Sequence, residues 1–180
     1  MRHFWGPAIC ILTVLIPSVS SNAQSQVTDF RGTWTFKSGA NPYRISTLVI
    51  TQSVSKLEVV ETSQPDKQKK QRVLTYNLDG RGESNLAIDG SRELVSRTLW
   101  KEDTLLVVFP NVSQRPGQKS ERHDQWMLSK DGKTLTITII TETTKPSIDA
   151  STIPLPIPRP TPDPYKRFQF VEKRVFQKQK

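Results

Sequence analysis

The sequence predicts an all-β protein, and more specifically an antiparallel up-and-down β-barrel of about eight or nine strands. Short stretches of alternating apolar and polar residues cover most of the chain after residue 29, and this period of two is typical of half-buried strands. Asp-Gly dipeptides, which favour tight turns, separate several of these stretches. No stretch of helical length repeats its apolar residues with a period of 3.6.

The first 23 residues have the pattern of a secretory signal peptide, with cleavage expected after Ala23. The apolar run from Ala8 to Ile16 is far shorter than the roughly 20 residues that a bilayer span requires. We therefore expect an exported protein that does not span the membrane and is periplasmic or extracellular. Cys10 lies within this segment, so we expect the mature chain to have no thiol and no disulfide.

The remaining residues are enough for one domain with a sizeable core. We assign residues 24–144 to the main body of a barrel, 145–164 to a Pro-rich extended connector, 165–176 to a closing strand and 177–180 to a basic tail. The full chain carries a net charge of +9, which favours contact with anionic surfaces.

The strands are expected in a regular order along the chain. A hairpin at 129–132 is the clearest signal, because Asp131-Gly132 separates two alternating segments. In the second of these, Leu135, Ile137 and Ile139 share one face. The expected strands are residues 30–37, 45–53, 56–63, 72–78, 93–101, 105–109, 122–128, 133–141 and 165–176.

Proline occupies every second position from Pro154 to Pro164. This density removes backbone donors and fixes φ, so the segment can be neither a helix nor the interior of a sheet. We interpret it as a spacer that returns the last strand to the first. The alternative is a recognition motif for a partner with an aromatic groove.

A sheet with this many strands removes its edges by closing or by splitting into two layers. We expect a closed barrel in which the last strand pairs with the first, and a β-sandwich is the alternative. Bulky apolar residues on the strands are the candidates for an interior ligand site. The principal ones are Trp34, Phe36, Trp100, Leu106, Val108 and Trp126.

Two segments carry a resemblance to a known family. Asp29-Phe30-Arg31-Gly32-Thr33-Trp34 resembles the Gly-x-Trp opening of lipocalins and the wider calycin group, and the hairpin from Leu128 to Thr136 is similar to one in exported bacterial lipocalin-like proteins. The resemblance implies that Trp34, two residues after Gly32, packs across the closed end of the barrel. It also implies that a late arginine stacks on this indole, and Arg174 is preferred over Arg167.

Chemistry-bearing motifs are few. His123 and Asp124 are adjacent on an expected strand, so their side chains should point to opposite faces. The sequence has no metal-ligand spacing, phosphate-binding loop or nucleophile motif. We therefore predict no enzyme, no catalytic residue, no metal and no cofactor.

Two functions fit these observations. The first is binding of a small apolar or amphipathic ligand inside the barrel. The second is a packed structural or interaction protein of the cell envelope, which meets an anionic surface through basic loops such as 67–72 or a partner through the Pro-rich segment. We expect no nucleic-acid binding, and either a monomer or a dimer that exchanges the last strand.

Overall fold

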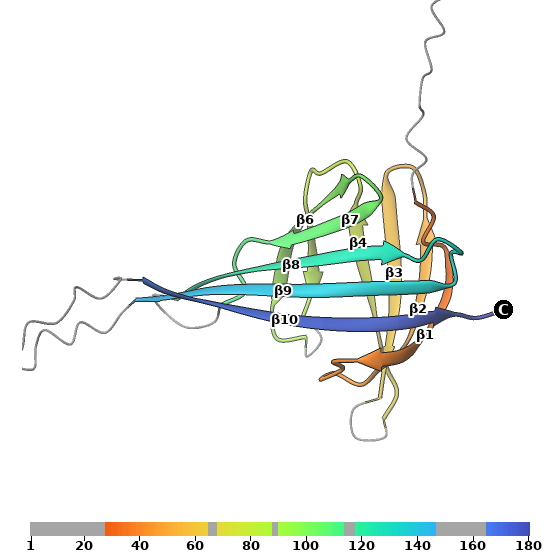
Figure 1. Ribbon diagram of the computed structural model, residues 1–180, viewed down its shortest axis with the longest axis horizontal. Coiled ribbons are helices and arrows are strands. Elements are labelled where there is room, and N and C mark those ends of the chain that lie inside the picture. Colours follow the sequence, from red (N-terminus) through yellow and green to blue (C-terminus); the bar gives the residue numbers. More distant parts are fainter. Residues whose placement is uncertain (1–27, 65–67, 88–89, 114–117, 147–164) are drawn as a thin grey trace, which may run out of the picture.

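The computed structural model describes residues 28–64, 68–87, 90–113, 118–146 and 165–180. These residues form ten antiparallel strands that curl into a nearly closed up-and-down barrel (Figure 1). The strands are β1 (Gly32–Gly39), β2 (Ile45–Gln52), β3 (Lys56–Ser63), β4 (Lys70–Asn77), β5 (Glu83–Leu86), β6 (Glu93–Lys101), β7 (Thr104–Phe109), β8 (Lys119–Leu128), β9 (Thr134–Pro146) and β10 (Tyr165–Lys178). No helix in the described ranges is long and apolar enough to cross a membrane.

The prediction of an antiparallel barrel is confirmed, but its strand count was too low. The additional strand is β5, which has only four residues and begins with Glu83, Ser84 and Asn85. This strand lacks the alternation of apolar and polar residues that revealed the others. The predicted signal peptide and most of the predicted connector lie outside the described residues.

The first and last strands pair with each other, as predicted. The ladder runs from Trp34 opposite Lys178 to Gly39 opposite Arg174. The strand order is therefore β4-β3-β2-β1-β10-β9-β8-β7-β6-β5. Its two ends, β4 and β5, adjoin without a backbone ladder among the described residues, and side chains bridge this seam.

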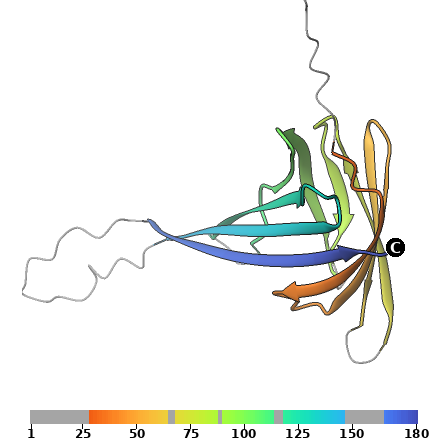
Figure 2. The same ribbon diagram turned by 45° about the vertical axis from the view of Figure 1, so that its right-hand side comes forward.

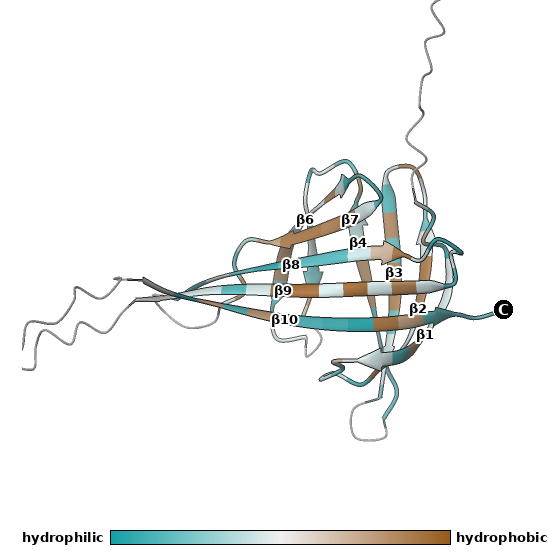
Figure 3. Cartoon of the chain, viewed as in Figure 1, coloured by the Kyte–Doolittle hydropathy of each residue, from teal (hydrophilic) through white to brown (hydrophobic). Residues whose placement is uncertain are grey.

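Residues on the inner face alternate with residues on the outer face along each strand. Figure 3 shows hydrophobic and more polar residues alternating along β9, whereas β7 has the colour of hydrophobic residues over most of its length. The inner face of β7 carries Leu105, Val107 and Phe109, whereas Leu106 and Val108 are half-buried on the other face. The prediction of Leu106 and Val108 as interior residues was therefore wrong, because a strand that is apolar at every position gives no signal for its orientation.

The segment before β1 covers one end of the barrel. Phe30 is fully buried and stacks on Trp100 at a centroid distance of 5.8 Å. The amide of Phe30 donates to Gln52 Oε1, and Trp34 Nε1 donates to the Phe30 carbonyl oxygen, both at 2.9 Å. Trp34 is itself fully buried, so aromatic side chains fill this closed end.

The cation over the Trp34 ring is Lys178, whose Nζ lies 5.3 Å from the ring centroid. Arg174, the arginine expected there, instead lies over the ring of Tyr43 at 5.9 Å. The strand register explains this difference, because β10 places Lys178 opposite Trp34 and Arg174 opposite Gly39.

Strands β9 and β10 are the longest, and they extend as a two-stranded ribbon beyond the other strands (Figures 1 and 2). Their pairing is continuous from Tyr165 opposite Pro146 to Gln177 opposite Thr134. Residues 145 and 146, which we had placed in the connector, therefore belong to β9.

Candidate ligand-binding site

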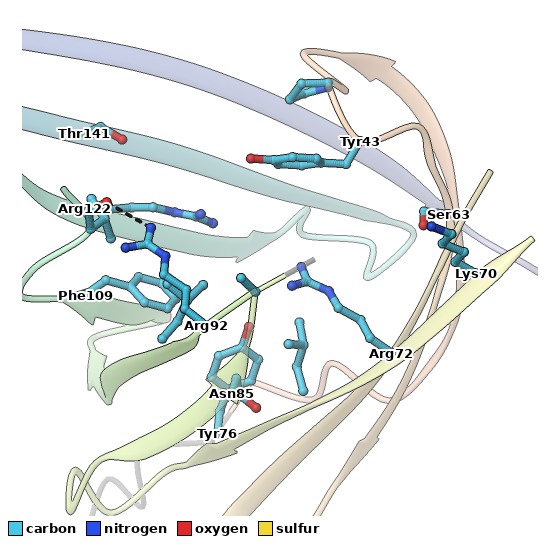
Figure 4. Close-up of a pocket in the computed structure, with 15 residues that line it drawn as sticks. Tyr43, Ser63, Lys70, Arg72, Tyr76, Asn85, Arg92, Phe109, Arg122 and Thr141 are labelled. Atoms are coloured by element: carbon cyan, nitrogen blue, oxygen red, sulfur yellow. Dashed lines mark hydrogen bonds between the residues drawn. The ribbon is translucent and has the colours of Figure 1, made fainter. Parts of the chain in front are cut away.

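A cavity of about 530 Å³ occupies the end of the barrel opposite the aromatic closure. It lies between the open ends of the strands and the segments that connect β1 to β2, β5 to β6 and β7 to β8. Within the described part of the chain, no carboxylate lines this cavity, whereas Lys70 and three arginines do. The arginines Arg72, Arg92 and Arg122 reach into the same space from different parts of the wall (Figure 4).

Arg122 is held by a bidentate ion pair within β8. Its Nε donates to Asp124 Oδ1 at 2.6 Å and its Nη2 donates to Asp124 Oδ2 at 2.5 Å. The two residues are two positions apart, so both point inward with Trp126. The Arg122 guanidinium also lies 4.9 Å from the centroid of the Phe109 ring, which is within the range of a cation–π contact.

Burial lowers the pKa of Arg122, but the Asp124 carboxylate raises it by more, so the net shift is upward. Arg122 therefore carries its positive charge at neutral pH. The Asp124 carboxylate neutralises that charge. It lies deeper in the barrel than the guanidinium, because only 6% of the Asp124 side chain is exposed, compared with 26% of the Arg122 side chain. The guanidinium edge that is left over faces the cavity.

A second bidentate pair lies on the opposite wall. The register of β3 and β4 places Glu61 opposite Arg72. Arg72 Nε donates to Glu61 Oε1 at 3.0 Å and Nη2 donates to Glu61 Oε2 at 3.1 Å. Arg72 Nη1 also donates to the Leu86 carbonyl oxygen at 3.2 Å, across the seam between β4 and β5. This arginine therefore links the cavity to the closure of the barrel.

Arg92, just before β6, is in a different situation. Its Nη2 donates to the Val112 carbonyl oxygen at 3.0 Å, which is the dashed line in Figure 4. Its Nε is buried and has no hydrogen-bond partner among the residues that the structure describes. The ion pairs found among the described residues do not include Arg92. Among the described residues, two of the three arginines are thus matched by an acid, and Arg92 carries a positive charge that no described acid pairs.

Tyrosine and apolar side chains complete the wall. Tyr76 points into the cavity between the arginines (Figure 4), and burial, with a contribution from the Asp124 charge, raises its pKa. It therefore stays a neutral phenol, which can donate a hydrogen bond. Leu94, Phe109 and Val112 provide an apolar side. A site with clustered cations and one apolar wall suits an amphipathic anion.

The apolar residues predicted as the interior site do not line this cavity. Trp126 lines a smaller, deeper space of about 40 Å³, and its ring meets Tyr76 edge-on at 5.8 Å. Trp34 and Trp100 belong to the aromatic closure. Phe36 packs edge-on against Phe176, with ring centroids 5.6 Å apart. Leu106 and Val108 face away from the interior, as described above.

The sequence contains a signal that would have revealed the arginines. Arg72 lies at a spacing of two from the buried residues Leu74 and Tyr76, so it shares their face of β4. In the same way, Arg122 shares the face of β8 that carries Asp124 and Trp126. The period of two thus places these charges on the inner face. Arg92 could not be found in this way, because it precedes its strand.

His123 and Asp124 point to opposite faces, as predicted. His123 Nε2 lies 3.0 Å from Glu121 Oε1, whereas Asp124 faces inward to Arg122. In the described ranges, no group of three or more His, Cys, Asp or Glu residues is arranged to hold a metal ion.

Comparison with family models gives no match for this chain, and comparison with curated proteins gives none either. The structure therefore shows an antiparallel barrel, and no family assignment confirms the resemblance to lipocalins.

Proposed function

We propose that this protein is an exported binding protein that holds a small amphipathic molecule in the open end of its barrel, with the anionic group of that molecule at Arg92. The observation that carries the proposal is the buried, unpartnered Nε of Arg92 in a cavity that no described carboxylate lines. A buried N–H group without a hydrogen-bond partner is costly, although the Arg92 side chain as a whole is only half-buried. An anionic group would supply the charge-assisted hydrogen bonds that this guanidinium lacks.

The remaining wall supports the same assignment. Arg72 and Arg122 are fixed by their own acids, so they can add directed hydrogen bonds without moving. Leu94, Phe109 and Val112 would cover the apolar part of the ligand. The volume of about 530 Å³ lies within the range of small-molecule sites, which is about 300–1,000 Å³. The role is binding without chemical turnover.

Oleate and oleyl alcohol form a suitable pair of probes, because they share an alkyl chain and differ in charge. We expect isothermal titration of the full chain to show binding of oleate and much weaker binding of the alcohol. Arg92→Gln should weaken oleate binding by about 10- to 100-fold, because a hydrogen bond to a charged group contributes about 1.5–3 kcal/mol. The affinity for oleyl alcohol should not change.

Arg81→Gln is the matched control, since Arg81 is an exposed arginine that pairs with Asp79 outside the cavity. It removes the same charge from the protein and should leave oleate binding unchanged. Equal losses in the two variants would show that overall charge, rather than the site, attracts the probe. If neither probe binds, the cavity is not an amphiphile site, and the envelope-interaction function becomes the better hypothesis.

A further inference from the structure

One edge of β10 is only partly covered. β1 pairs with β10 from Arg174 to Lys178, and the last backbone contact is the hydrogen bond from the Ala40 amide to the Lys173 carbonyl oxygen, 2.9 Å long. Within the described part of the chain, no strand pairs with this edge over residues 165–172. The uncovered length belongs to the ribbon that extends past the barrel (Figures 1 and 2).

Gly39 explains why β1 leaves β10 at this point. Its φ is +108°, and a Cβ atom there would lie 2.0 Å from the Lys173 carbonyl oxygen. The chain therefore turns away from β10 and continues toward Tyr43 over the cavity. The end of the pairing is thus built into the backbone.

The uncovered edge is ready to form a further ladder. The Lys173 carbonyl accepts from the amide of Ala40, the residue after β1, and the Gln179 amide donates to the Thr33 carbonyl of β1. The peptide groups of odd-numbered residues therefore point to this side of β10. Because its pairing with β9 is free of bulges, the same holds for residues 165, 167, 169 and 171. Phe170 and Val171 are 62% and 56% exposed, on opposite faces of the ribbon. A long exposed edge with apolar side chains favours pairing with another strand.

We propose that two copies of this chain join through this edge, with the β10 strands antiparallel and Gln169 opposite Gln169 on the two-fold axis. This proposal is independent of the ligand-binding function. The register places Phe168 opposite Phe170 of the second copy at two symmetric points, and Arg167 opposite Val171. Aromatic pairs are favourable partners across antiparallel strands.

Other registers fit less well. A two-fold axis at Arg167 places two arginines directly opposite each other, and an axis at Val171 requires an edge that β1 already covers. An axis at Phe168 makes one aromatic pair, between the two copies of Phe168, whereas the axis at Gln169 makes two Phe168–Phe170 pairs. The axis at Gln169 therefore gives the larger aromatic contact. The association is isologous, so it closes at two copies.

Disulfide trapping tests the register. In a Cys10→Ser background, Gln169→Cys should oxidise to a covalent dimer, since hydrogen-bonded antiparallel partners have Cα atoms about 5.5 Å apart, which suits a disulfide. Arg167→Cys is the matched control. The two copies of residue 167 would lie four positions apart along the strands, or about 13 Å, which is too far to bridge.

A pair of charge variants tests the interface in solution. Val171→Lys places a lysine opposite Arg167 of the second copy at two symmetric points, and it should raise the dimer dissociation constant at least tenfold in sedimentation equilibrium. Val171→Glu makes the same contact attractive and should preserve the dimer. A concentration-independent monomer would overturn the proposal. A dimer whose dissociation constant is the same in Val171→Lys, Val171→Glu and the unmodified protein would also overturn it. So would a covalent dimer that forms as readily in Arg167→Cys as in Gln169→Cys.

Discussion

The carboxamide of Asn85 makes two hydrogen bonds to the backbone of Thr75: its Oδ1 accepts from the Thr75 amide at 2.7 Å, and its Nδ2 donates to the Thr75 carbonyl oxygen at 2.8 Å. One side chain thus supplies the donor and the acceptor that an opposing strand residue would supply. It does so at the seam between β4 and β5, where the described residues form no ladder. At the same seam, the Asn77 amide of β4 donates to Glu83 Oε2 of β5 at 3.0 Å.

Replacing Asn85 with leucine should therefore open the seam. Asn85 is buried, and its loss leaves two backbone groups of Thr75 without partners. We expect the free energy of unfolding in urea to fall by about 2–4 kcal/mol, because each unsatisfied buried group costs about 1–3 kcal/mol. Asn85→Asp keeps the acceptor but loses the donor, so its loss should be intermediate at neutral pH.

Asn111→Leu is the control for the change in residue type, because Asn111 is exposed. It should leave the unfolding midpoint almost unchanged. Hydrogen exchange at the Thr75 amide should accelerate in the Asn85 variants and not in this control. If Asn85→Leu unfolds at the same urea concentration as Asn111→Leu, the side-chain bridge does not hold the seam.

Gly39→Ala should weaken the pairing of the first and last strands. The new Cβ atom meets the Lys173 carbonyl oxygen at 2.0 Å in a backbone with positive φ, so β1 and β10 must separate. We expect a loss of about 3 kcal/mol, which combines a positive-φ cost of about 1–2 kcal/mol with the lost hydrogen bond from Ala40. Thermal and urea unfolding would measure it.

Gly132→Ala separates the two contributions. Gly132 also has a positive φ, of +65°, but a Cβ atom there meets nothing within 4 Å. This variant should lose only the conformational contribution of about 1–2 kcal/mol. Equal losses at Gly39 and Gly132 would contradict the idea that the missing Cβ atom of Gly39 permits the close approach of β1 to the Lys173 carbonyl oxygen.

The barrel fold could be predicted from the sequence because the signals for its strands and turns lie in short local segments. Alternation along the strands and the Asp-Gly turns specify which segments pair. The hairpin at Asp131-Gly132 forms as expected, with the Gly132 amide bonded to the Ser129 carbonyl oxygen at 2.8 Å. Burial of Trp34 also agrees with its predicted position. The features that escaped prediction are those without a local pattern, namely the short polar β5 and the inner face of β7.

The site was missed for a different reason. We expected an interior lined by apolar residues, and we placed Arg72 in a basic loop, 67–72, that meets an anionic surface. The structure buries Glu61 and Asp124 as partners of Arg72 and Arg122, and the pairing of Glu61 with Arg72 depends on strand register. A buried charge is tolerated when it is paired and hydrogen-bonded. Such pairs across a barrel become visible only once the strands are placed.

The balance of charge inside the barrel gives a last prediction. Asp124→Asn removes the carboxylate that neutralises Arg122, so a second arginine becomes available to an anion. We expect oleate to bind about 3- to 10-fold more tightly, which corresponds to roughly 0.7–1.4 kcal/mol, while oleyl alcohol binds as before. The free energy of unfolding without ligand should fall by about 1–3 kcal/mol, which is less than for a fully buried pair because Arg122 borders the cavity.

Two further variants make this prediction specific. Glu58→Gln changes the net charge equally at an exposed position, where Glu58 pairs with Lys56, and should leave oleate binding unchanged. The double variant Arg92→Gln, Asp124→Asn restores the number of uncompensated arginines to one, so its affinity should return toward that of the unmodified protein. If the effects of the two substitutions on the free energy of oleate binding simply add in the double variant, Arg122 does not share the anion with Arg92. Unchanged or weaker oleate binding in Asp124→Asn would refute the idea that uncompensated interior charge drives recognition.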